Sequence, residues 1–430
     1  MTGNERIYRD AVHNIIRVDL GEPGGELIGR LIDAPEFQRL RRIRQLGLAY
    51  FAYQTAEHSR FTHSLGAFHL ATRVLARLSR KYSISDDDAL AVRVAALLHD
   101  IGHGPFSHVV ESILGFHHED FTVEAVKSQS TAVGRILSSY SKSLPDDVSA
   151  IIRGEFRRMA LGQLVSSQLD VDRMDYLLRD TMMTGVKYGI YDLEWVIKSI
   201  EINEETDQLY VAAPGLYAVE DYLQARYYMF RQVYFHRTLR AAEAVLRSIV
   251  RRAMELRSSG REVWYAEGTP FESVLSGKRL SIEEHLSLDD SDVLFHIKRW
   301  CLSEDTILSD LAKRFIDRRL FKAIDLDMPE PERAAFVEAA RNAVAESGFD
   351  VDHYFVEDTA GREPYFFYAG DLARPKDLIY VEDGFSKPQI REISQMSAAV
   401  RGLQNGTGIH RICFPAEARA LIESNYRGIS

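Results

Sequence analysis

The chain has 430 residues, of which 46% are hydrophobic and 27% charged, with a formal net charge of -10. This is the composition of an ordinary globular protein, and no run of about 20 apolar residues predicts a membrane span. The acidic balance disfavours nucleic acid as the main partner, since such binding usually requires a basic domain or stripe. A polar N-terminus and only two cysteines, Cys301 and Cys413, predict a cytoplasmic protein without a disulfide framework.

One early segment departs from the acidic average. Residues 38–44 contain four arginines in seven positions, next to a glycine turn. On composition alone, such a run is most often the solvated face of a helix, and a local anion site is the alternative.

Residues 27–250 are predicted to form a succession of helices. Apolar residues recur at three- and four-residue spacing from Ala67 to Tyr82 and from Ala89 to His99. Acidic residues at 86–88 predict the N-terminus of the second helix, because carboxylates there cap free N–H groups and complement the helix dipole. A hairpin arm is expected at 207–211, before an Ala-Ala-Pro-Gly turn.

The sequence texture changes after about residue 255. We predict a core over residues 1–250, a helical extension over 251–330 with acidic helices around 282–294, and a small α+β region over 331–430. The fold class is therefore mainly α. In the last region, four strands and one helix are expected: strands at 351–355, 365–368, 378–381 and 409–414, and a helix near 389–403.

Histidine and aspartate gather in four segments: 59–66, 99–108, 117–120 and 170–180. Imidazole nitrogen and carboxylate oxygen together suit a first-row divalent ion. Adjacent helical residues do not face the same way, so the His99–Asp100 pair requires its helix to end there, and Gly102 supplies that ending. A metal so held can activate water and neutralise phosphate oxygens, which predicts a metal-dependent phosphohydrolase.

A purely structural interpretation of these residues must be weighed. A single histidine in an apolar helix is more often a hydrogen-bonded core residue, and Asp-rich turns are mostly caps. That interpretation suits His69 and Asp86. It suits the four segments together poorly, because they lie in apolar, glycine-bounded surroundings where unpaired polar groups are costly.

These segments resemble the HD-domain superfamily, and more closely its deoxynucleoside triphosphate (dNTP) triphosphohydrolase branch, which includes the sterile-alpha-motif and HD-domain enzyme of animals. The resemblance covers roughly residues 6–245 and implies a helical HD-domain core. It assigns four metal ligands: His63, His99, Asp100 and Asp172. Asp170 competes with Asp172 on sequence alone. The ligand types accommodate manganese, magnesium, iron, zinc, nickel or cobalt.

The resemblance also implies a nucleotide site. Three arginines would hold phosphate oxygens, a role that suits a planar guanidinium: Arg60, Arg173 and Arg226. The nucleoside would meet five further residues: Tyr176 against sugar and base, Gln45 and Asp180 at the 3′-hydroxyl, and Leu46 and Tyr234 at the 2′ position.

For catalysis, the resemblance implies attack of a metal-activated water on the α-phosphorus, which gives a deoxynucleoside and inorganic triphosphate. A histidine would protonate the departing 5′-oxygen. The implied catalytic residues are His108 and His118, with Glu111 and Glu119 as orienting carboxylates and His103 near the phosphate.

The arginine-rich run acquires a second interpretation from the resemblance. Asp33, Gln38 and Arg41 match residues that bind guanine in an activating nucleotide site. GTP or dGTP bound there would favour a homo-oligomer, a dimer or tetramer, over free subunits. The chain departs from the animal enzyme at three positions: Arg173 replaces a lysine, Phe230 a histidine and Arg9 an asparagine.

Two alternative functions remain open. The metal ligands alone would permit an HD phosphohydrolase acting on nucleoside monophosphates, cyclic nucleotides or nucleic-acid ends. A protein that binds nucleotides as a sensor, without turnover, is the alternative from another class. Three phosphate-binding arginines and the Leu46–Tyr234 pair favour the dNTP triphosphohydrolase.

Overall fold

The computed structural model describes residues 4–107, 109, 111, 113, 115–360, 378–384, 388–403 and 409–427. The protein is mainly α, as predicted, with three small sheets among these residues. One hydrophobic core runs from Ile16 to Ile422 and joins all the regions described below. None of the helices described combines the length and the apolar character needed to cross a membrane.

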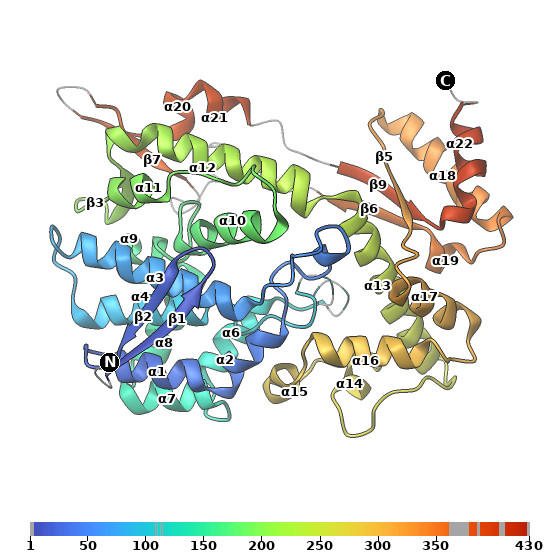
Figure 1. Ribbon diagram of the computed structural model, residues 1–430, viewed down its shortest axis with the longest axis horizontal. Helices are drawn as coiled ribbons and strands as arrows, with labels where there is room; N and C mark the ends of the chain where they lie inside the picture. Colours follow the sequence, from blue (N-terminus) through green and yellow to red (C-terminus); the bar gives the residue numbers. More distant parts are fainter. Residues whose placement is uncertain are drawn as a thin grey trace.

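The helical core extends from the N-terminus to the long helix α13 (Figure 1). Its elements are β1 (Glu5–Asp10), β2 (Asn14–Asp19), α1 (Gly25–Asp33), α2 (Pro35–Arg39), η1 (Leu40–Arg42), η2 (Ala49–Phe51), α3 (Arg60–Leu78), α4 (Asp86–Leu98), α6 (His118–Lys127), α7 (Ala132–Tyr140), α8 (Leu144–Arg153), α9 (Met159–Gln163), α10 (Val171–Thr184), α11 (Leu193–Ser199), β3 (Ile200–Asn203), β4 (Gln208–Val211), η3 (Ala213–Gly215), α12 (Leu216–Met229), the π-helical turn η4 (Phe230–Tyr234) and α13 (Arg237–Ser258).

Helix α3 is the centre of this core, because it packs against both α4 and α10. Its buried residues, such as Leu65 and Phe68, recur at the spacing that predicted a helix here, although the helix begins at Arg60 rather than Ala67. The side chain of Ser85 caps α4 by accepting the N–H of Asp88. The predicted acidic N-terminus of α4 is therefore confirmed. The β1–β2 hairpin was not predicted.

The extension and the C-terminal region follow α13. They comprise α14 (Phe271–Leu275), α15 (Ile282–Ser287), α16 (Asp290–Trp300), α17 (Thr306–Ile316), β5 (Lys322–Asp325), α18 (Glu330–Glu346), α19 (Val351–Tyr354), β6 (Val356–Ala360), β7 (Tyr380–Glu382), β8 (Ile390–Glu392), α20 (Ile393–Met396), α21 (Ala398–Gly402), β9 (Ile409–Phe414), η7 (Ala416–Ala418) and α22 (Arg419–Arg427).

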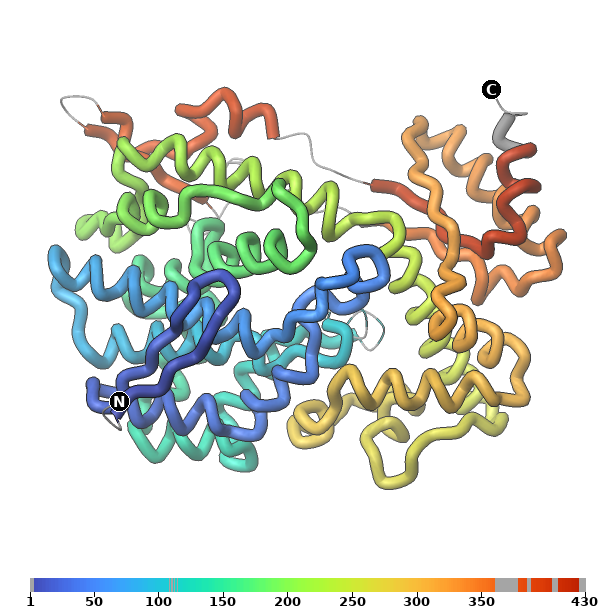
Figure 2. Tube along the Cα trace, in the orientation of Figure 1, coloured from blue at the N-terminus to red at the C-terminus, as the bar shows by residue number. Residues whose placement is uncertain are grey.

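The C-terminal region divides between two places in the molecule, which the red segments of Figure 2 show. Strands β5, β9 and β6 form an antiparallel sheet that contacts α13. Strand β7 instead pairs in parallel with β4 of the helical core, and α21 contacts α12. Residues 331–430 thus pack partly on the core and partly beside the extension.

One predicted C-terminal strand is wrong, and one predicted helix is confirmed only in part. Residues 351–354 form helix α19 rather than a strand, because Asp350 caps them by accepting the N–H groups of Asp352 and His353. The helix expected near 389–403 begins instead as strand β8 and continues as two short helices. Strands at 378–381 and 409–414 are confirmed as β7 and β9. The strand predicted at 365–368 lies outside the described residues.

The packing of the extension generates a stability prediction. Trp300 of α16 is 1% exposed, and its indole N–H donates to the carbonyl of Trp264 over 2.7 Å. Trp300→Ala should lower the free energy of unfolding by about 3–5 kcal/mol, measured by urea denaturation, because it leaves a large cavity. Leu302→Ala, at a residue 75% exposed, should change it by about 0.5 kcal/mol or less. Equal effects of the two variants would contradict the packing described here.

Candidate metal centre and nucleotide site

Three helices bring His63, His99 and Asp172 together. His63 lies in the first turn of α3, His99 directly follows α4, and Asp172 lies in the first turn of α10. The Nε2 atoms of the two histidines are 3.2 Å apart, and Asp172 Oδ1 is 3.1 Å from His63 Nε2 and 3.6 Å from His99 Nε2. One ligand atom from each residue can therefore reach a single ion.

The hydrogen bonds of the two histidines indicate their tautomers. His99 Nδ1 lies 2.9 Å from the carbonyl oxygen of Ala96, and His63 Nδ1 lies 2.8 Å from Asp175 Oδ2. Both partners accept hydrogen bonds, so each Nδ1 carries a proton and each Nε2 is the ring nitrogen that faces the cluster. Two Nε2 atoms at 3.2 Å require a positive charge between them, which either a shared proton or a metal ion can supply. These residues therefore fit a divalent metal ion.

The pKa shifts of the clustered residues agree with a site that binds a cation. Burial alone would lower the pKa of His63, but the carboxylates of Asp172 and Asp175 outweigh it and raise that pKa to about 10. Burial would raise the pKa of Asp172, yet hydrogen bonds with His63 and His99 hold it well below its usual range. The carboxylates thus stay ionised and stabilise a cation beside them.

Asp100 borders the same cluster. Its Oδ1 is 3.4 Å from His99 Nε2, and its Oδ2 is 3.8 Å from His63 Nε2. The chain can turn here because Gly102 packs closely on α6: a Cβ at residue 102 would lie 2.2 Å from the carbonyl oxygen of His118. The rival ligand, Asp170, instead caps α10 by accepting the N–H of Arg173.

A residue that we did not predict, Asp175, orients the cluster. Besides His63, its carboxylate lies 2.7 Å from His13 Nε2 and accepts both Nε and Nη2 of Arg179. Gly66 makes this approach feasible, because a Cβ there would lie 1.8 Å from Asp175 Oδ1. The available signal was the spacing of Asp172 and Asp175, which places both carboxylates on one face of a helix.

A second group lies next to the first. His118 Nδ1 is 3.1 Å from Glu111 Oε1, the rings of His103 and His118 stack at 3.7 Å, and His103 Nε2 is 3.3 Å from Asp100 Oδ1. Three of the predicted catalytic residues therefore converge beside the metal cluster. Glu119 is exposed in the first turn of α6, and His108 lies outside the described residues.

The predicted phosphate-binding arginines differ in how many of their N–H groups already have a hydrogen-bond partner. Arg60 is buried and bonds Asp100 Oδ2 and Ser107 Oγ. Arg173 bonds Asp170 and the carbonyl of Ser167.

Arg226 donates to Gln168 Oε1, but the Nε atoms of Arg226 and Arg173 are both buried with no hydrogen-bond partner among the described residues. Burial, followed by the nearby charge of Arg173, lowers the pKa of Arg226. Arg226 is buried and Arg173 is half-buried, and an unused N–H on each of two such cations is a feature of an anion site.

The predicted sugar-binding residues also converge. Asp180 is 2% exposed, its Oδ1 lies 2.8 Å from His58 Nε2, and its Oδ2 accepts the hydroxyl of Tyr234 over 2.9 Å. The rings of Tyr176 and Tyr234 lie 6.2 Å apart, and Tyr176 lies 6.4 Å from the ring of His63.

Gln45 and Leu46 are half-buried. The Oε1 of Gln45 has no hydrogen-bond partner in the described part of the chain. His58, which we did not predict as a site residue, precedes Arg60 by two positions in the segment that the resemblance singled out.

The arginine-rich run is not a uniform solvated face. Arg39 is 1% exposed, whereas Arg41 and Arg42 are exposed. Gln38 Oε1 accepts Arg41 Nε over 2.8 Å, and Asp33, at the end of α1, is bound by Arg6. The predicted regulatory residues thus include one hydrogen-bonded pair, Gln38 and Arg41.

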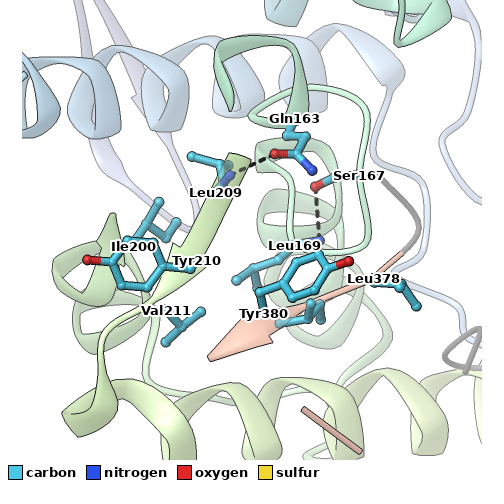
Figure 3. A pocket seen from close by; sticks show the side chains of 10 residues that line it. Gln163, Ser167, Leu169, Ile200, Leu209, Tyr210, Val211, Leu378 and Tyr380 are labelled. Carbon is cyan, nitrogen blue, oxygen red and sulfur yellow. Dashed lines mark hydrogen bonds between the residues drawn. The ribbon is translucent and has the colours of Figure 1, made fainter. Parts of the chain in front are cut away.

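A separate small cavity lies between the loop after α9 and strands β4 and β7 (Figure 3). Its volume is about 20 Å³, and Leu169, Val211 and Ile379 contribute to its mostly apolar lining. That volume suits a water molecule rather than a nucleotide, so this cavity is not the substrate site.

Comparison with known proteins places these residues in context. The HD domain model matches residues 60–180, and the HD associated region model matches residues 191–264. Protein YwfO of Bacillus subtilis is 38% identical over 96% of this chain and 93% of its own length. The crystal structure of a phosphohydrolase from Bacteroides thetaiotaomicron matches with a TM-score of 0.80 and 30% identity, over 95% of this chain and 99% of that chain.

More distant relatives include deoxynucleoside triphosphate triphosphohydrolase SAMHD1 of Gallus gallus. It is 30% identical over 58% of this chain and 45% of its own length. The SAMHD1 homolog of Dictyostelium discoideum is 29% identical over 56% of this chain and 48% of its own length. The match therefore spans less than half of either of these relatives.

The role of Asp175 can be tested without a substrate. Asp175→Asn should weaken manganese binding about 10- to 100-fold, measured by titration calorimetry, because His63 loses the carboxylate that fixes its tautomer and orientation. The exposed Asp221 on α12 provides the control, and Asp221→Asn should bind as the wild type does. An unchanged affinity in Asp175→Asn would remove Asp175 from the metal centre.

Proposed function

The chain belongs to the HD-domain phosphohydrolase family, and from this premise we propose that it hydrolyses dNTPs to deoxynucleosides and inorganic triphosphate. One observation carries the proposal: Arg173 and Arg226 each have a buried Nε without a hydrogen-bond partner among the described residues. Arg173 lies close enough to Asp172 for their charges to interact, and Arg226 lies correspondingly close to Tyr176 and Tyr234. A phosphate group bound to these arginines would hold the attached sugar close to Tyr234.

The arginines have distinct roles in this proposal. The charge of Arg173 interacts with the carboxylate of Asp172, so Arg173 and the metal centre would meet the same phosphate. Arg226 enters from α12 and would supply a second guanidinium. Arg60 already binds Asp100 and Ser107, and it would neutralise charge beside the ligands as well as contact phosphate.

A bound divalent ion supplies an activated water and neutralises charge on the phosphate oxygens. The residues of the second group would manage the proton that the departing 5′-oxygen requires. Glu111 fixes the orientation of His118 through Nδ1, and His103 stacks on the His118 ring. An imidazole is suited to this proton transfer near neutral pH.

Selection for a deoxyribose would come from the side of the site formed by Asp180 and Tyr234. The hydroxyl of Tyr234 is fixed by Asp180, so the ring is held in place. Tyr234 and Leu46 would crowd a 2′-hydroxyl, while the 3′-hydroxyl would donate its one hydrogen bond to either Asp180 or Gln45. The unused Oε1 of Gln45 supports that last assignment.

We also propose that GTP or dGTP activates the enzyme at Asp33, Gln38 and Arg41 and favours an oligomer. The Gln38–Arg41 hydrogen bond supports a shared role for these two residues. The guanidinium carbon of Arg41 lies 3.5 Å from the centre of the Phe61 ring. Phe61 belongs to α3, the helix that also carries His63.

The product assay tests the proposed reaction. Purified protein with manganese or magnesium is incubated with each of the four dNTPs, with and without GTP, and the products are resolved. Deoxynucleoside plus triphosphate is expected, and chelation of the metal or the double substitution His99→Ala with Asp100→Ala should abolish it. Dependence on GTP would support the activating site.

Two other results of this assay would each contradict the proposal. Monophosphate products would favour an HD phosphohydrolase that acts on monophosphates, cyclic nucleotides or nucleic-acid ends. Nucleotide binding without any product would favour a sensor.

Sugar selection is tested at Tyr234. Tyr234→Ala should raise turnover of ribonucleotides relative to deoxyribonucleotides by at least about tenfold, because the ring that crowds the 2′ position is lost. Tyr234→Phe retains the ring and removes only the hydrogen bond to Asp180, so it should keep most of the discrimination. If steady-state kinetics show the same selectivity in the wild type and Tyr234→Ala, the ring does not select the sugar.

A further inference from the structure

The loop at residues 100–107 connects the metal ligand Asp100 to Ser107, and its backbone is strained. Phe106 and Ser107 have φ angles of 49° and 53°, a left-handed conformation that residues other than glycine rarely adopt. Two such residues in succession persist only where surrounding contacts hold them. The source of those contacts therefore bears on the geometry of the metal centre.

Two side chains of the helical extension hold this loop. His285 Nε2 lies 2.7 Å from the carbonyl oxygen of Gly102, which accepts its hydrogen, and Asp290 Oδ1 accepts the N–H of Phe106 over 2.8 Å. Both residues are almost fully buried. The His285 ring is also stacked on Phe121 of α6, with the ring centres 3.8 Å apart. The extension thus contacts the loop at its start and at its strained end.

Arg39 donates hydrogen bonds both to the loop and to the helical extension. Its guanidinium donates to the carbonyls of Ile101 and His103 in the loop, over 3.2 and 2.8 Å. It also donates to the carbonyls of Leu288 and His285, over 2.6 and 3.3 Å. Burial lowers the pKa of Arg39 to about 10, and its described hydrogen bonds all go to neutral carbonyls. Burying a cation without a charged hydrogen-bond partner is costly. Arg39 is therefore not explained as an ordinary surface arginine.

Hydrogen bonds also connect the end of the loop to the metal ligand Asp100. Ser107 Oγ accepts two hydrogen bonds from Arg60, over 3.0 and 2.8 Å, and Arg60 Nη1 donates to Asp100 Oδ2 over 2.6 Å. Asp290 also accepts the N–H of Arg44, whose carbonyl oxygen accepts the hydroxyl of Ser107. A continuous series of hydrogen bonds therefore joins Asp290 to Asp100.

We infer that residues 285–290, which run from the last turn of α15 to the first residue of α16, position the metal centre, with His285, Asp290 and Arg39 as the positioning residues. This segment lies outside the residues that match the HD domain and the HD associated region, which end at 264. The helical extension is then a working part of the active site. The inference concerns the metal site alone and does not depend on which phosphoester is hydrolysed.

Three substitutions test it. His285→Phe retains an aromatic ring for stacking on Phe121 and removes the bond to Gly102. Asp290→Ala removes both acceptor oxygens, while Asp290→Asn keeps one acceptor for the Phe106 N–H. Val293→Ala is the control for lost stability, since it truncates a buried apolar side chain of the same helix that makes none of the hydrogen bonds described above. Manganese affinity is measured by titration calorimetry, and amide hydrogen exchange is followed in peptides covering 101–107.

His285→Phe and Asp290→Ala should each weaken manganese binding about tenfold and speed exchange in the loop, by the effect that supporting residues have on metal sites. Asp290→Asn should lie between Asp290→Ala and the wild type. Val293→Ala should match the wild type in both readouts.

The inference would be overturned if His285→Phe and Asp290→Ala kept the manganese affinity and the loop exchange of the wild type. It would also be overturned if Val293→Ala weakened manganese binding and sped loop exchange as much as they do. Neither readout uses a nucleotide, so failure of the dNTP proposal in the product assay would leave this result to be judged separately.

Discussion

The close approach of two imidazole nitrogens is the constraint on which the site depends. His63 and His99 direct their Nε2 atoms at each other across 3.2 Å, a distance at which a proton or a metal ion must lie between them. Much of the neighbouring structure serves to maintain this approach. The Ala96 carbonyl and the Asp175 carboxylate fix the two rings through Nδ1, and Gly66 leaves room for Asp175. A metal ion bound here would take the place of the proton between the two nitrogens, so metal binding would release a proton.

The arginines around this centre fall into two kinds. Arg39 and Arg60 direct their hydrogen bonds at the loop that bears the metal ligand, and they hold the framework in place. Arg173 and Arg226 each keep a buried Nε without a partner in the described structure, and we propose that these groups bind an anion. The same side chain therefore builds the site in one pair and binds phosphate, as we propose, in the other. Composition does not distinguish these uses, because only the fold determines which N–H groups are already occupied.

Sequence patterns predicted the helical class, since helical spacing is a local property, and they identified the segments rich in histidine and aspartate. The choice of His63, His99 and Asp172 within those segments came from the family resemblance. Sequence patterns could not predict contacts made over long separations. Asp290 meets Phe106 across 184 positions, and Arg39 meets Leu288 across 249. For the same reason, composition alone favoured a solvated face for residues 38–44, although Arg39 within them is buried. The strand expected at 351–355 was wrong because the Asp350 cap outweighed the strand propensity of the residues that follow.

The most direct test of the metal centre is a crystal structure of the manganese-soaked protein, with data collected at the manganese absorption edge. The account predicts an anomalous peak within coordination distance of His63 Nε2, His99 Nε2 and Asp172 Oδ1, with Asp100 beside it. A peak confined to His103, Glu111 and His118, or no peak at all in a protein that binds manganese in solution, would contradict it.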